Sequence, residues 1–220
     1  MSERQIPDLD ATAQVAAADA NGSTRRELVR SGLAAGAAAA AAALLPPLLS
    51  PAGALAAPIG DAAVLVLALR AEQAVLYAYE GTLASGVISA STAQVLKMFL
   101  GQEHEHVDAL TVHLERLGGT APAPPSDLAA FELLLRELQI KQSPSTLRNE
   151  REYLSFLVKV EAELANIYHF AIEQLVDDQL IQTAAQIMAN EGQHATLLRE
   201  LISPGNVRRA VPRAFVGGAT

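Results

Sequence analysis

Two stretches of this chain repeat one arrangement of acidic residues and histidine. Each copy has a single glutamate and, about thirty positions later, a Glu-x-x-His motif. The residues are Glu72, Glu103 and His106 in the first copy, and Glu161, Glu191 and His194 in the second. Any fold for this chain has to accommodate four carboxylates and two imidazoles, so the faces on which they lie constrain it strongly.

The apolar residues recur at steps of three and four, which is the period of an α-helix with one buried face. This pattern predicts long helices at about 61–84, 91–117, 146–175 and 178–202. Short turns join the first helix to the second and the third to the fourth, which makes antiparallel neighbours. A crossover at 118–145 joins the two pairs and carries a short amphipathic segment. No useful strand alternation is present, so the predicted fold class is all-α, an antiparallel four-helix bundle with one long crossover carrying a short helix.

Both Glu-x-x-His motifs interrupt apolar faces. Glu103 and His106 share their face with Leu96, Phe99 and Leu110. The second motif lies in the same way among apolar residues of the last long helix, namely Leu180, Ala184, Ile187 and Leu198. Residues at this spacing face the core of a helical bundle, so both motifs are predicted to point inward.

The third long helix offers two glutamates, and the helical period distinguishes them. Glu161 shares its face with leucines and with Tyr168, whereas Glu163 shares its face with Lys159 and Asn166. Glu161 is therefore the predicted inward residue. Glu72 lies on a comparable apolar face of the first helix.

Isolated carboxylates in an apolar interior cost several kcal/mol each or become protonated. Two divalent cations would balance four carboxylates, and two imidazoles would complete the ligand set. The six repeated residues are therefore the predicted ligands of two divalent metal ions. Oxygen and nitrogen ligands favour Fe first and Mn second, with Zn as a further candidate. The chain has no cysteine, which excludes thiolate sites such as iron–sulfur clusters.

Tyrosines follow both single glutamates at a spacing of seven: Tyr79 after Glu72 and Tyr168 after Glu161. Two interpretations stay open. The tyrosines could hydrogen-bond to the ligand carboxylates and support the site, or they could be core residues whose hydroxyls are satisfied elsewhere. His113 also lies on an inward face, and we expect a hydrogen-bonded core histidine there rather than a ligand.

Residues 1–56 have the three parts of an export signal. Arg25 and Arg26 precede an Ala-rich apolar run at 31–45, and Ala54-Leu55-Ala56 follows as a small-x-small cleavage sequence. This region resembles a twin-arginine (Tat) leader cleaved after Ala56. The alternative is an uncleaved anchor, although Pro46 and Pro47 interrupt the run before it reaches the length of a membrane span. The expected location is periplasmic or secreted, with membrane contact only through an uncleaved leader.

The chain has a net charge of −8, and this acidic balance excludes a basic surface for nucleic acid. The tail at 203–220 contains proline and glycine and is expected to lie on the surface or to be loose.

Residues 57–220 form one predicted domain, and its four long helices, at about 61–202, resemble the ferritin-like superfamily of di-iron and di-manganese carboxylate proteins, because the six repeated residues match that family's ligand positions without a gap. The chain is most similar to the Tat-exported ferritin-like domain proteins of bacteria. The resemblance implies that Glu103, together with Glu161 or Glu191, bridges the metals, and that the metals activate dioxygen or peroxide. Rubrerythrin-type peroxidases of this superfamily carry a cysteine-bound iron. Since this chain lacks cysteine, a peroxidase reaction would need a separate electron donor.

The leading functional hypothesis is a di-metal oxidoreductase that acts on a small oxidant or a metal ion, with ferroxidase, peroxidase and catalase-like reactions all open. The alternative is a non-catalytic cell-envelope protein that binds metal structurally, or that binds a partner through residues 126–141 or its basic tail. The apolar face of that segment could be an exposed docking surface or, as we expect, could pack across the bundle. A metal-storage cage is a third option, and a monomer or homodimer in solution would exclude it. A homodimer is compatible with the first two hypotheses.

Overall fold

The computed structural model describes residues 60–212. These residues form helices and loops without any strand, so the predicted all-α class is confirmed. The elements are α3 (Asp61–Ala84), α4 (Ala90–Arg116), α5 (Leu128–Glu137), the 3-10 turn η2 (Pro144–Thr146), α6 (Glu150–Gln174), α7 (Asp178–Ile202) and α8 (Val207–Ala210). The predicted leader at 1–56 and the last part of the tail lie outside the described residues.

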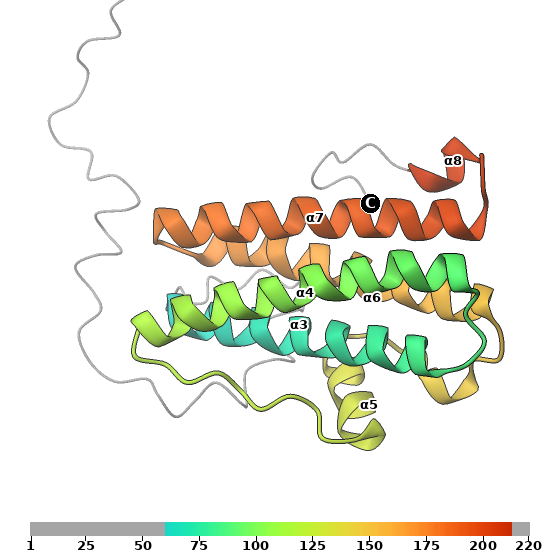
Figure 1. Ribbon diagram of the computed structural model, residues 1–220. Helices are drawn as coiled ribbons and strands as arrows, with labels where there is room; N and C mark the ends of the chain where they lie inside the picture. The colour runs from blue at the N-terminus through green and yellow to red at the C-terminus, as the bar shows by residue number, and fades with distance from the viewer. Residues whose placement is uncertain (1–59, 213–220) are drawn as a thin grey trace, which may run out of the picture. The chain divides into compact units, whose positions relative to one another are not determined.

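The long helices form two hairpins, α3 with α4 and α6 with α7 (Figure 1). The hairpins pack together mainly through α3 and α6, while α4 and α7 pack less closely. The crossover, residues 117–149, runs from the end of α4 to the start of α6 and carries α5. This is the predicted antiparallel bundle with one long crossover.

Side-chain caps define where several helices begin. Ser89 accepts a hydrogen bond from the amide of Thr92 at the start of α4, and Asp177 caps α7 in the same way. Asn149 accepts one from the amide of Glu152, so α6 begins at Glu150 rather than near residue 146. Residues 144–146 form a separate 3-10 turn instead, with Pro144 at its first position and Ser143 as its cap. This turn explains why α6 begins later than predicted. Such caps satisfy backbone amides that have no partner within the helix.

α3 is the most completely buried helix because the crossover covers the side that α4 and α6 leave open. Phe131 of α5 packs on Tyr77 with 4.5 Å between ring centroids. Gln73 donates a hydrogen bond of 2.6 Å to the carbonyl of Pro122. Arg70 forms an ion pair with Glu137 at the end of α5. α3 is long and apolar enough to cross a membrane by composition alone, and these contacts explain its composition as that of a core helix.

The apolar face of α5 is packed rather than exposed. Its side chains Phe131, Leu134, Leu135 and Leu138 are buried, while Leu128 at its edge and Leu133 of the same helix are exposed. The idea that this face forms an exposed docking surface is therefore wrong, because α3 already covers it. The beginning of the tail is also ordered: α8 packs against α7, and Ala210 is buried.

Candidate metal centre

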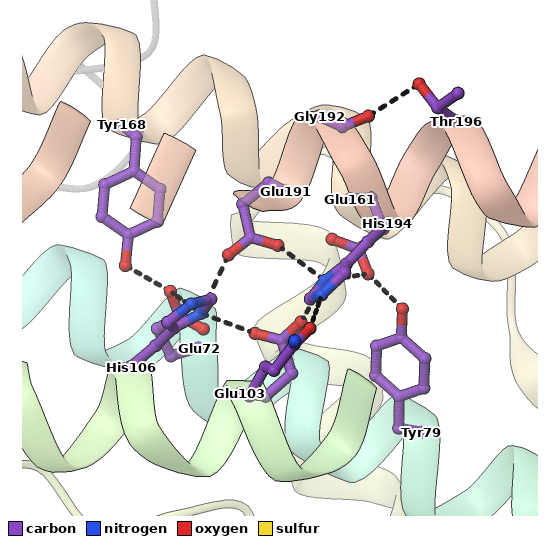
Figure 2. A network of polar contacts seen from close by, with 11 residues as sticks. Glu72, Tyr79, Glu103, His106, Glu161, Tyr168, Glu191, Gly192, His194 and Thr196 are labelled. Carbon is purple, nitrogen blue, oxygen red and sulfur yellow. Dashed lines mark hydrogen bonds and ion pairs between the residues drawn. The ribbon is translucent and has the colours of Figure 1, made fainter. Parts of the chain in front are cut away.

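The six residues singled out from the sequence converge at one level of the bundle (Figure 2). They come from all four long helices: Glu72 from α3, Glu103 and His106 from α4, Glu161 from α6, and Glu191 and His194 from α7. The four glutamates are fully buried and His194 is 1% exposed, whereas 12% of the His106 side chain is exposed. Glu163, the alternative to Glu161, lies outside this cluster and is half-buried.

The ligand-type atoms form two overlapping groups, and within each group one such atom from every residue lies within 4.8 Å of the others. The His106 subsite consists of Glu72, Glu103, His106 and Glu191, and the His194 subsite consists of Glu103, Glu161, Glu191 and His194. Each histidine points its Nδ1 atom toward the carboxylates. His106 Nδ1 lies 3.0 Å from Glu103 Oε2 and 3.0 Å from Glu191 Oε1. His194 Nδ1 lies 2.8 Å from Glu103 Oε1 and 3.4 Å from Glu191 Oε2.

Glu103 and Glu191 are the two carboxylates that both subsites share. Each presents one oxygen to His106 and the other to His194. Glu161 lies near His194 only, and Glu72 near His106 only. Of the two partners considered for Glu103 as a bridge, the geometry therefore favours Glu191 and makes Glu161 a terminal group.

The two tyrosines connect the hairpins through crossed hydrogen bonds. Tyr79 of α3 donates its hydroxyl proton to Glu161 of α6, and Tyr168 of α6 donates to Glu72 of α3 (Figure 2). Both tyrosines are fully buried. Of the two interpretations of these tyrosines, the structure therefore supports the one in which their hydroxyls hydrogen-bond to candidate ligand carboxylates.

Two residues around His194 were not identified from the sequence. Gln102 Oε1 lies 2.7 Å from His194 Nε2, on the side of the ring away from the carboxylates. Phe99 stacks on the same ring, with 4.2 Å between centroids. Phe99 had been recognised only as an apolar residue of the inward face. His113 lies outside both subsites, and its Nε2 atom is 3.3 Å from the hydroxyl of Thr183, linking α4 to α7.

The protonation of the carboxylates reflects their burial. Desolvation raises the pKa of Glu72 and that of Glu161 well above the ordinary range, and neighbouring carboxylates add to this effect. Burial also acts to raise the pKa of Glu191, but its close contacts with the imidazoles of His106 and His194 outweigh burial and hold that pKa at about 2. Without metal ions, Glu72 and Glu161 therefore tend to keep their protons while Glu191 is ionised.

The histidines respond in the opposite sense. Burial acts to lower the pKa of His106, but its contacts with Glu103, Glu191 and Glu72 raise it to about 12. The same balance, through Glu103 and Glu161, raises the pKa of His194 to about 11. Burial and the adjacent carboxylates raise the pKa of both tyrosines, so their hydroxyls stay protonated. Protons on the imidazoles thus supply the positive charge that the carboxylates require.

Several buried atoms nevertheless have no hydrogen bond within residues 60–212. Those in the cluster are Glu72 Oε2, Glu103 Oε1, Glu161 Oε2, both carboxylate oxygens of Glu191, and His194 Nδ1; the others are Arg70 Nε and Thr82 Oγ1, outside the cluster. The contact between Glu103 Oε1 and His194 Nδ1 is of ion-pair length but lacks hydrogen-bond geometry. Buried polar atoms are nearly always paired, and the unpaired atoms of the cluster are all ligand types for hard or borderline divalent cations. The residues present therefore fit a pair of divalent metal ions.

Comparison with known proteins agrees with the fold. The sequence model of the ferritin-like domain matches residues 60–204, so the chain belongs to the ferritin-like domain family. It resembles the crystal structure of a conserved hypothetical protein from Mycobacterium tuberculosis with a TM-score of 0.55 and 19% identity, covering 66% of this chain and 91% of that one. At this identity the likeness supports the fold alone. No match is found among curated proteins.

Proposed function

We propose that this protein is an exported di-metal oxidoreductase that acts on dioxygen, peroxide or Fe(II). The observation that carries the proposal is the pair of subsites that share Glu103 and Glu191. Two bound Fe or Mn ions would supply the redox equivalents for such a reaction. Fe is the first candidate and Mn the second, because the donors are carboxylate and imidazole groups without sulfur.

The chain's own residues would orient the carboxylates and keep water away. Glu103 and Glu191 would each present one oxygen to either ion, while Glu72 and Glu161 would be terminal ligands. The hydroxyls of Tyr79 and Tyr168 hydrogen-bond to the terminal glutamates, which restricts their rotation and keeps a proton close to each carboxylate. Supporting hydrogen bonds of this kind tune both the affinity and the reactivity of metal sites.

Export by the Tat pathway and a periplasmic or secreted location complete the proposal. The support is the arginine pair and the apolar run within residues 1–56. A Tat substrate crosses the membrane folded, so its metals could be inserted in the cytoplasm. A peroxidase reaction would use a separate electron donor, because the chain has no cysteine for a rubredoxin-type iron centre.

The direct test is elemental analysis of protein purified from the exported fraction, combined with an optical spectrum. We expect close to two Fe or Mn ions per chain, as in other di-metal carboxylate bundles. Glu103→Ala should lose them, whereas Glu105→Ala, which changes an exposed neighbour on the same helix, should retain them. Wild-type protein without metal, even after anaerobic incubation with Fe(II) or Mn(II), would refute the proposal.

Turnover is measured as consumption of peroxide and of Fe(II) by the metal-loaded protein. Activity that disappears in Glu103→Ala and persists in Glu105→Ala supports an oxidoreductase. Two bound metals without either activity would favour the alternative, a non-catalytic metal-binding protein of the cell envelope. Partner binding through the apolar face of α5 is not favoured, because that face is buried against α3.

A further inference from the structure

The two hairpins repeat the candidate ligands and the tyrosines, but the residues around the two histidines differ. In the first hairpin, Phe99 lies four residues before Glu103 and Gln102 lies one residue before it. The same positions before Glu191 are occupied by Ile187 and Asn190. The two subsites therefore have equivalent ligand types and unequal surroundings.

The ring of His194 is held from three directions. Its Nδ1 atom faces Glu103, its Nε2 atom faces Gln102 Oε1 at 2.7 Å, and Phe99 stacks on it with an interplanar angle of 28°. Tyr79 in turn meets Phe99 edge-on, with 6.3 Å between centroids. If Nδ1 is the ligand atom, Nε2 carries the proton and donates a hydrogen bond to Gln102 Oε1. Gln102 therefore fixes the tautomer in which Nδ1 is free to coordinate.

The ring of His106 lacks this support. All its polar contacts within residues 60–212 are made through Nδ1, toward Glu72, Glu103 and Glu191. The Nε2 atom has no protein partner there, and 12% of the side chain is exposed. Ile187 and Asn190, which occupy the positions of Phe99 and Gln102 in the other hairpin, provide neither a stacking ring nor a hydrogen bond to the His106 imidazole. His106 projects toward Glu191 of α7, at the side of the bundle where α4 and α7 pack less closely than α3 and α6 do.

Solvent therefore has unequal access to the two subsites. The crossover covers the bundle on the side of α3, through the ring of Phe131 and the carbonyl of Pro122. Among the six candidate ligands, His106 is the most exposed.

We propose that the two subsites bind metal unequally, with Gln102 as the positioning residue that makes the His194 subsite the tighter one. The His106 subsite is then the one that exchanges its ion and that small molecules reach. This inference rests on the proposed function, since it presupposes that both subsites bind a divalent cation. A hydrogen bond to the second nitrogen of a metal-binding histidine typically changes metal affinity by about 10- to 100-fold.

The test is a titration of the metal-free full-length protein with Mn²⁺, followed by the signal of the free ion and by calorimetry. Wild-type protein should bind two ions per chain in two resolved steps. His194→Gln should remove the tighter step and His106→Gln the weaker one, which assigns each step to a subsite. When the loaded protein is mixed with excess chelator, one ion per chain should leave well before the other.

Gln102→Ala should weaken the tighter step by about 10- to 100-fold and leave the weaker step unchanged. Asn190→Ala is the matched control at the corresponding position, and it should leave the tighter step unchanged. Gln102→Glu keeps an acceptor for the Nε2 proton and should preserve tight binding, which distinguishes positioning from general damage to the fold.

Two ions binding in the wild type with equal affinity, or equal effects of Gln102→Ala and Asn190→Ala, would overturn the inference while leaving the proposed function intact. Wild-type protein that binds no Mn²⁺ and no Fe²⁺ would instead refute the proposed function, and the inference with it.

Discussion

The metal-free protein should become less stable as the pH rises from about 6.5 to 8.5, which is unusual for an acidic protein. The cause lies in the two buried imidazoles, whose pKa values are raised to about 12 for His106 and about 11 for His194. A histidine in the unfolded chain has a pKa of about 6.5. A raised pKa in the folded state stabilises the fold fully below that value, and this stabilisation is lost as the pH rises toward the folded pKa.

The magnitude follows from the protons that folding retains. Between pH 6.5 and 8.5 the unfolded chain releases a proton from each of these histidines, while the folded protein keeps both. For each histidine, this difference in bound protons lowers the free energy of unfolding by about 2 kcal/mol as the pH rises from about 6.5 to 8.5. The two histidines together lower it by about 4 kcal/mol. For a domain of this size, that loss corresponds to a fall in Tm of about 10 °C.

The assay is thermal unfolding of chelator-treated protein, followed by circular dichroism at both pH values. Metal-loaded protein should not lose stability in this way, because metal replaces the protons on the imidazoles. The double variant H106Q/H194Q should lose the pH dependence, whereas His104→Gln, at an exposed position, should retain it. A Tm of the metal-free protein that stays constant or rises between the two pH values would refute this account of the site.

Three substitutions test other parts of the structure through urea unfolding. Tyr168→Phe leaves the buried carboxylate of Glu72 without its hydroxyl donor and should cost about 1–3 kcal/mol; a cost no larger than that of Tyr153→Phe, at a half-buried position, would contradict that role. Phe131→Ala removes the main buried ring of α5 and should cost about 3–5 kcal/mol, so a loss below about 1 kcal/mol would mean that the crossover is not firmly packed. Asn149→Ala removes the cap of α6 and should cost about 1 kcal/mol, and an unchanged urea midpoint would show that the cap contributes nothing.

The sequence predicts the convergence of the six candidate ligands because helical periodicity reports which face of a helix is buried. Glu161 and Glu163 illustrate its resolving power: two residues apart, they differ in their neighbours at three and four positions, and the structure buries only Glu161 fully. Helix starts are harder to predict. The start of α6 depends on the cap at Asn149 and on the local turn at Pro144, neither of which alters the apolar pattern.

Periodicity does not report which neighbouring helix a residue meets, and that limit explains why Gln102 was missed. It lies one position before Glu103, rotated by about 100° around the helix, and so falls off the apolar face. Its partner His194 is on α7, so only the packing of α4 beside α7 brings the two together. For the same reason, the choice between Glu161 and Glu191 as the second shared carboxylate required coordinates.

The crossed tyrosine contacts and the shared glutamates have a further consequence for how the protein opens. Each subsite takes three groups from one hairpin and the fourth from the other: Glu191 completes the His106 subsite, and Glu103 completes the His194 subsite. Neither hairpin alone therefore contains a complete set of donors. Cations bound at these positions would cross-link the two halves of the molecule, so that separating the halves and releasing the ions become a single cooperative event.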